Sequence, residues 1–162
     1  MMPKLILMRH AKSGWGDPTL PDHDRPLNAR GVTSASALGD WLRAQGHLPD
    51  QALVSSALRT QRTFAGLALD LEPERHARLY GAGSSVLLSS LRAARGKAVL
   101  LIAHNPGIGE FAERILSKMP GHQHFLDYPT GATLVAEVPD WPDLDFGQAR
   151  VLDFVTPHDL KT

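Results

Sequence analysis

The sequence predicts an α/β fold, a three-layer sandwich in which helices cover both faces of a mostly parallel sheet. Short apolar runs, typical of buried strands, alternate with segments whose apolar residues recur at helical spacing. The chain has 162 residues, 43% of them hydrophobic and 21% charged, which suits one globular domain. Strands that alternate with helices in this way form crossover units on a parallel sheet. We therefore expect residues 1–162 to form a single domain.

The first half of the chain contains two strand–helix pairs. The apolar run at residues 4–8 predicts a buried strand, and residues 32–45 follow it with apolar positions at helical spacing. Gly46 is a suitable end for that helix. Residues 52–55 form a second short apolar run, and residues 57–69 are helical in composition.

The second half continues the alternation and then closes the sheet. Residues 84–95 are amphipathic, and "AVLLIA" at 98–103 is the clearest buried strand of the chain. Asn105-Pro106 places an N-cap residue before a proline, which predicts a helix that extends to about residue 118. Residues 133–138 and 149–155 resemble two closing strands around a turn rich in Pro, Asp and Gly.

Two irregular segments, 14–31 and 119–132, are long for loops in a compact domain, and loops of this length are often functional.

Charge and composition exclude several classes of function. Lys plus Arg and Asp plus Glu both number 17, so no global attraction to nucleic acid or an anionic membrane is expected. The absence of cysteine excludes disulfides and thiolate nucleophiles. The apolar run Leu5 to Met8 is too short for a signal peptide or a membrane span, so we expect a cytoplasmic protein.

Basic and titratable side chains follow three of the predicted strands. Arg9 and His10 leave the first strand, Arg59 lies in the first turn after the second, and His104 directly follows "AVLLIA". In open α/β sheets, ligands bind beyond the carboxyl ends of the strands. Guanidinium groups and free N–H groups at helix starts both favour phosphate. The pattern therefore predicts a phosphate pocket at this edge of the sheet.

Each of these residues has a plainer interpretation when it is taken alone, as a helix cap, a core residue or a surface charge. Their coincidence at three strand ends favours the pocket. Arg62 could share it, although a solvated helix face fits that residue better. His122 and His124 are a weak metal signal, because no third ligand stands nearby at a recognised spacing. The remaining histidines outside the pocket are expected at the surface: His23, His47, His76 and His158.

Four motifs, "LMRHAKS", "RPLNARG", "SSALRTQRT" and "IAHNPGI", resemble in order and spacing the histidine phosphatase superfamily, in particular its small bacterial phosphohistidine phosphatase branch. The resemblance spans about residues 4–138. It implies that His10 is the nucleophile and carries the phosphoryl group, with Arg9, Arg59 and His104 completing the phosphate pocket. It also implies a six-stranded mixed sheet with one antiparallel strand, and neither metal nor cofactor.

The chain departs from the larger phosphoglycerate mutase-like relatives at two positions. Ala77 stands where those relatives carry a catalytic glutamate before a Tyr-Gly pair, and Gly16 stands where they have an asparagine. Asn28 is expected to take over that asparagine's phosphate contact. The candidates for a general acid are three loop or strand carboxylates: Asp22, Asp24 and Glu74.

Substrate class follows from the chemistry of the leaving group. An alkoxide that leaves a phosphate monoester needs a proton donor, whereas imidazole leaves phosphohistidine readily once its ring is protonated. Protein phosphohistidine is therefore the expected substrate, hydrolysed through a phosphohistidine on the enzyme. A phosphatase of small phosphate esters is the first alternative, and a phosphate-recognising module without turnover is the second.

Overall fold

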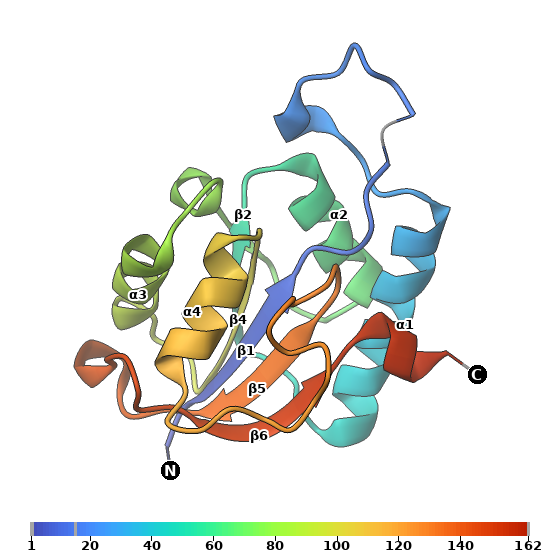
Figure 1. Cartoon of the computed structure of the whole chain (residues 1–162). Helices are drawn as coiled ribbons and strands as arrows, with labels where there is room; N and C mark the ends of the chain where they lie inside the picture. The colour runs from blue at the N-terminus through green and yellow to red at the C-terminus, as the bar shows by residue number, and fades with distance from the viewer. Residues whose placement is uncertain (1, 15, 162) are drawn as a thin grey trace.

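A computed structural model of the chain shows a six-stranded mixed sheet between two layers of helices (Figure 1). The structure describes residues 2–14 and 16–161. The strands are β1 (Lys4–Arg9), β2 (Gln51–Ser55), β3 (Glu74–His76), β4 (Ala98–Ala103), β5 (Thr133–Glu137) and β6 (Arg150–Val155). The α-helices are α1 (Ala29–Gln45), α2 (Leu58–Leu67), α3 (Ser84–Arg92) and α4 (Gly107–Ile115). Short 3-10 helices are η1 (Asp22–Asp24), η2 (Ala77–Leu79), η3 (Trp141–Asp143) and η4 (Pro157–Leu160).

The strand order is β3-β2-β4-β1-β5-β6. β4 pairs in parallel with β1 and β2, and β2 pairs in parallel with β3. β5 pairs antiparallel with β1 and with β6. One strand, β5, therefore runs against the other five, which confirms the predicted mostly parallel sheet with a single antiparallel strand.

The side chains of β1 alternate between two hydrophobic cores, as the period of a strand requires. Leu5 and Leu7 belong to the core that α3 and α4 cover, whereas Ile6 and Met8 belong to the core beneath α1 and α2. All four are fully buried, and each contributes about 1.5–3 kcal/mol by leaving water. This packing on both faces confirms the predicted three-layer sandwich and fixes β1 at its centre.

One strand was not predicted, and several bounds differ by a few residues: α1 begins at Ala29 instead of residue 32, and α3 ends at Arg92 instead of residue 95. β3 was not predicted, because it is a three-residue edge strand of sequence ERH without an apolar run. α4 ends at Ile115 and not near residue 118, because the next backbone groups pair elsewhere. Leu116 forms a parallel bridge with Ala149, and the Ser117 N–H donates to the Ala149 carbonyl at 2.8 Å.

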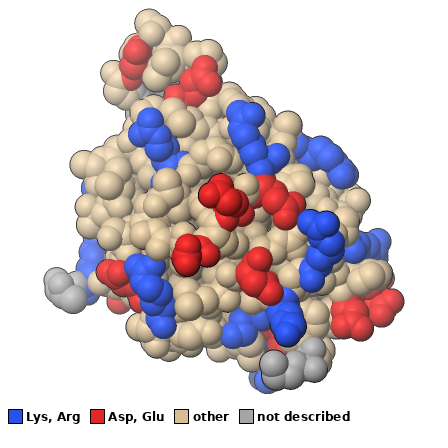
Figure 2. Space-filling view, turned by 180° about the vertical axis from the view of Figure 1, so that it is seen from behind, with Lys and Arg blue, Asp and Glu red and all other residues tan. Residues whose placement is uncertain are grey.

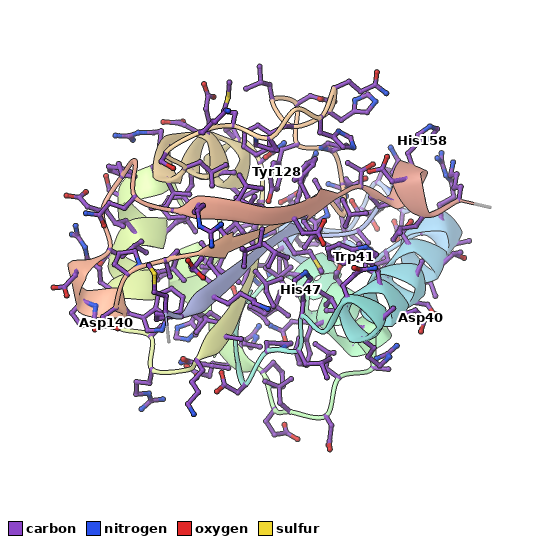
Figure 3. The ribbon with its side chains drawn as sticks, turned by 90° about the horizontal axis from the view of Figure 1, so that it is seen from below. Asp40, Trp41, His47, Tyr128, Asp140 and His158 are labelled. Atoms are coloured by element: carbon purple, nitrogen blue, oxygen red, sulfur yellow. The ribbon has the colours of Figure 1, made fainter. Side chains whose placement is uncertain are left out.

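The surface position predicted for His47 is wrong. Its ring lies beside that of Trp41, with centroids 5.5 Å apart, and is largely buried (Figure 3). The Lys4 ammonium can only donate, so it donates to Nδ1 at 3.1 Å, and the Nε2–H of His47 donates to Asp153 at 3.2 Å. His47 thus joins the end of α1 to β1 and β6, a non-local arrangement that local polarity does not reveal.

The charged side chains of the rear face are intermixed. Figure 2 shows Lys and Arg beside Asp and Glu over most of that face, in keeping with a formal net charge of zero. None of the helices in the described residues is long and apolar enough to cross a membrane.

Candidate active site

Four of the predicted site residues meet at the carboxyl edge of the sheet. Arg9 ends β1 in register with Ala103, the last residue of β4, so His10 and His104 leave neighbouring strands side by side. Their ring centroids are 5.3 Å apart. Arg59, in the first turn of α2, is close enough to act electrostatically on both histidines. The structure therefore brings together the residues that the strand ends indicated.

The imidazole of His10 is held in one tautomer. Its Nδ1 lies 2.7 Å from the Ala11 carbonyl oxygen, which can only accept a hydrogen bond. Nδ1 therefore carries the proton, and Nε2 presents a lone pair. The next backbone group is fixed as well, because the Ala11 N–H donates to Thr63 Oγ1 of α2 at 2.9 Å. The result is a buried, oriented imidazole whose Nε2 has a free lone pair.

The surroundings of His10 keep its ring neutral. Burial lowers the pKa of His10 to about 4, against the opposing effect of its hydrogen bond to Ala11. The positive charges of Arg9, Arg59 and Arg25 act in the same direction as burial, because they disfavour a second cation. The unprotonated Nε2 is thus available throughout the neutral pH range.

Arg9 supplies a guanidinium group next to His10 in the chain. One of its terminal nitrogens donates to the Tyr128 carbonyl at 3.2 Å, so the 119–132 loop holds its orientation. Asn105 ties the same carbonyl to the start of α4, with its amide donating at 3.0 Å. The Nε of Arg9 is buried and has no hydrogen-bond partner within the described residues. That donor fits the oxygen of an anionic ligand.

His104 follows β4, the strand that pairs with β1. Its Nε2 lies 2.8 Å from Ser55 Oγ at the end of β2, while its Nδ1 is buried without a partner in the described residues. Burial, followed by the proximity of His10 and Arg59, lowers the pKa of His104 to about 3. Two residues of the candidate site, Arg9 and His104, thus each have a buried nitrogen without a partner in the described residues, and an oxyanion has the acceptor atoms that such donors lack.

Asp22 of η1 is bonded to Arg59 at two points. The Arg59 guanidinium donates to the Asp22 backbone carbonyl at 2.7 Å and to its carboxylate at 3.0 Å. The same carboxylate accepts from Tyr80 at 2.6 Å and from Arg25 at 2.9 Å. The Tyr80 hydrogen bond, with those from Arg59 and Arg25, holds the pKa of Asp22 well below its usual range despite burial. Asp22 is therefore a fixed carboxylate, unsuited to donating a proton.

The other two acid candidates are also poorly placed for proton donation. Glu74 accepts from the Gln51 amide at 2.9 Å, and Gln51 in turn accepts from the Gly96 N–H before β4. These contacts lie at the amino ends of β2 and β4, the edge of the sheet away from His10. Asp24 is exposed, and its carboxylate lies 3.6 Å from the His23 ring. None of the three candidates is arranged as a buried, protonated acid.

Four further residues from the sequence analysis have clear positions. Asn28 caps α1, with its side-chain oxygen accepting from the Gly31 N–H at 2.8 Å; its phosphate contact stays a prediction. Arg62 is exposed on α2. His122 and His124 pair with separate carboxylates, those of Asp159 and Asp127, and the described residues contain no cluster of three or more metal-ligating side chains.

Sequence reasoning missed Arg25, Tyr80 and Ser55 as parts of the site. Arg25 is buried and bonds to Gly14, Ser13 and Asp22, and it lies within the quoted motif "RPLNARG". Ser55 had an available signal, because it ends a strand at the same edge as His10. Local sequence could not reveal the contact between Tyr80 and Asp22, because it spans 58 residues.

Comparisons with known proteins agree with this geometry. A model of the histidine phosphatase superfamily (branch 1) matches residues 5–81. An uncharacterised protein of Mycobacterium tuberculosis is 33% identical over 161 residues, which cover 93% of this chain and 100% of the relative. Among solved structures, a candidate phosphohistidine phosphatase SixA from Nakamurella multipartitia has a TM-score of 0.85 at 30% identity and 97% coverage of both chains. A second, from Agrobacterium tumefaciens, has a TM-score of 0.80 at 26% identity, covering 97% of this chain and 99% of that chain.

Proposed function

This chain belongs to the histidine phosphatase superfamily, and from that premise we propose that it hydrolyses phosphohistidine in a protein substrate. The observation that carries the proposal is the state of His10. Its proton is fixed on Nδ1 by Ala11, and the positive charges of Arg9, Arg25 and Arg59 help to keep the ring neutral, with Nε2 free. A neutral imidazole next to three guanidinium groups suits attack on a phosphoryl group.

The proposed reaction has two displacements at phosphorus. In the first, the Nε2 lone pair of His10 attacks, and the P–N bond of the substrate breaks with its electron pair left on the departing imidazole, whose other nitrogen carries a proton. In the second, water attacks the phosphorus of phospho-His10, the P–N bond to Nε2 breaks, and inorganic phosphate leaves. The enzyme's imidazole is thereby regenerated.

Arg9, Arg59 and His104 have the chemistry to stabilise the transferring group. Guanidinium donors that are oriented before the reaction lower the energy of charge on the equatorial oxygens. The unpartnered Nε of Arg9 and Nδ1 of His104 supply two such positions. A bound phosphate dianion also raises the pKa of His104, which strengthens its donation. The guanidinium groups of Arg9 and Arg59 supply positive charge that a metal ion supplies in other phosphatases, so we expect metal-independent activity.

The substrate class is supported by the positions of the carboxylates. Asp22 is held as an anion by Tyr80 and Arg59, and Glu74 lies at the other edge of the sheet. A pocket without a poised acid favours a leaving group that needs none, as in phosphohistidine. The similarity to SixA structures named as phosphohistidine phosphatases points to the same class.

A direct test compares a histidine-phosphorylated peptide with para-nitrophenyl phosphate for the wild type, His10→Ala and Arg62→Ala. We expect turnover of both substrates, its loss in His10→Ala, and a near wild-type rate in Arg62→Ala. Rapid quenching should trap phosphate on His10 as an acid-labile, base-stable adduct. Binding of phosphate without turnover would instead support a recognition module, and a phosphoenzyme on another residue would refute the assigned nucleophile.

A further inference from the structure

A groove of about 800 Å³ runs beside the catalytic pocket and is not part of it. We call it the α1 groove. One wall is the face of α1 near its start, and the other combines the end of the 119–132 loop with η4, which lies against α1 (Figures 1 and 3). The lining residues that the argument uses are Lys12, Arg30, His124, Asp127, Thr130 and Lys161.

Residues on both walls of the α1 groove are connected to the backbone at or near His10. Lys12 lies two residues after His10, and its carbonyl accepts from the Asn28 N–H at 3.0 Å. Gly31 packs so closely on Lys12 that an added Cβ would lie 2.0 Å from this carbonyl oxygen. On the other wall, the Gly131 N–H bonds to the His10 carbonyl at 2.9 Å, directly after the lining residue Thr130. A chain seated in the groove therefore lies next to the catalytic pocket.

The charge of the α1 groove is positive. Lys12, Arg30 and Lys161 are exposed, and none of them forms an ion pair within the described residues. The lining has one carboxylate in the described chain, that of Asp127, which lies 3.3 Å from the His124 ring. The first turn of α1 contains no acidic residue, so its dipole adds to the positive potential. The intermixed charges of the rear face contrast with this arrangement (Figure 2).

We propose that the α1 groove binds an acidic segment of the protein substrate that flanks its phosphohistidine. This inference rests on the proposed phosphohistidine phosphatase activity. The lining residues on α1 run from Ala29 to Ala37, which corresponds to about 12 Å along the helix. An extended peptide covers that distance with about four residues. Two or three carboxylates on such a segment can pair with the groove cations, and they would steer the phosphorylated side chain toward His10.

The test uses matched phosphohistidine peptides that differ only in three flanking residues, either Asp or Asn. The variant Arg30→Glu/Lys161→Glu reverses two groove charges, and both residues are exposed. The matched control Lys97→Glu/Lys118→Glu reverses two exposed charges near the amino end of β4 and beyond α4. We expect the groove variant to raise KM for the Asp peptide about tenfold, with kcat and the Asn peptide little changed. Activity on para-nitrophenyl phosphate should stay within about twofold of wild type, and 0.5 M salt should erase the Asp preference.

An equal effect on the Asp and Asn peptides, or an equal effect of the control variant, would overturn the groove assignment and leave the phosphatase activity intact. If neither peptide nor para-nitrophenyl phosphate is hydrolysed, the proposed function fails instead. In that case the groove is tested by fluorescence anisotropy with a labelled, unphosphorylated Asp peptide. Binding that the groove variant loses and the control retains supports the surface, and equal binding by all three proteins refutes it.

Discussion

Asp22 and Arg59 form a two-point contact in which one guanidinium group bonds to both the carboxylate and the backbone carbonyl of the same residue, at 3.0 and 2.7 Å. Charge-assisted hydrogen bonds of this kind are stronger than neutral ones and hold the two residues in one orientation. The contact anchors η1 over α2 and sets the orientation of the arginine that reaches the phosphate pocket. It also makes Asp22 a positioning residue whose role differs from that of an acid.

The substitution Asp22→Asn separates these two roles. It retains the shape of Asp22 but removes the charge that holds Arg59, Arg25 and Tyr80. We expect kcat/KM to fall about tenfold, and by the same factor for substrates with good and poor leaving groups. A proton donor would give a loss confined to alkyl esters. The control is Asp24→Asn, an exposed neighbour, which should have little effect.

The two arginines of the first half of α2 should differ strongly when each is replaced by alanine. Arg59 is 7% exposed and acts electrostatically on both His10 and His104, whereas Arg62 is exposed on α2. We expect Arg59→Ala to lower kcat/KM by about 10²–10³, comparable with the loss of one preorganised oxyanion donor. Arg62→Ala should cost less than about threefold. A reversed order of the two losses would show that the wrong arginine has been assigned.

Folding stability should depend on pH through the buried histidines. The pKa of His10 is about 4 and that of His104 about 3 in the folded chain, against 6.5 as the reference value. Below pH 6.5 the unfolded state takes up protons that the folded state does not. The two histidines therefore leave the free energy of unfolding unchanged above pH 6.5 and lower it as the pH falls toward 4. The decline is on the order of 3 kcal/mol for His10 alone by linkage. Urea unfolding between pH 7 and 4.5 should show this decline, and the free energy of unfolding of His10→Asn should depend less steeply on pH. Equal slopes would refute the buried neutral ring.

How far the sequence predicts the site depends on whether a residue adjoins an apolar strand. Arg9, His10 and His104 follow runs whose burial is evident from composition, so topology alone places them at one edge. Asp22 lies in an irregular loop, and its partner Tyr80 is 58 residues away, so only the folded chain joins them. The strands follow the same rule. The apolar β4 was predicted with its correct bounds, whereas the short polar edge strand β3 was not predicted.

Oxyanions should bind between the two unpartnered nitrogens, Arg9 Nε and His104 Nδ1. Vanadate or tungstate at about 100 times its dissociation constant stabilises the folded state by about 2.7 kcal/mol, which raises the Tm by several degrees. Arg59→Ala should abolish most of that rise, because it removes a charged donor from the pocket. EDTA should leave both the Tm shift and the phosphatase activity unchanged. A loss of activity with EDTA that a divalent ion restores would demonstrate a metal site.

The dependence of rate on the leaving group decides between the two substrate classes. With Asp22 held as an anion, Glu74 at the far edge of the sheet and Asp24 exposed, none of these three candidates is arranged to protonate an alkoxide. The rate should therefore fall steeply as the leaving group becomes more basic, from phosphohistidine and nitrophenyl phosphate to alkyl phosphates of similar size. The measurement is kcat/KM across such a series for the wild type, Asp22→Asn, Asp24→Asn and Glu74→Gln. Parallel, steep lines for all four proteins support phosphohistidine as the substrate. A shallow line for the wild type, with one carboxylate whose removal costs about 10²–10⁴ on alkyl esters only, would replace that proposal with a phosphatase of small esters.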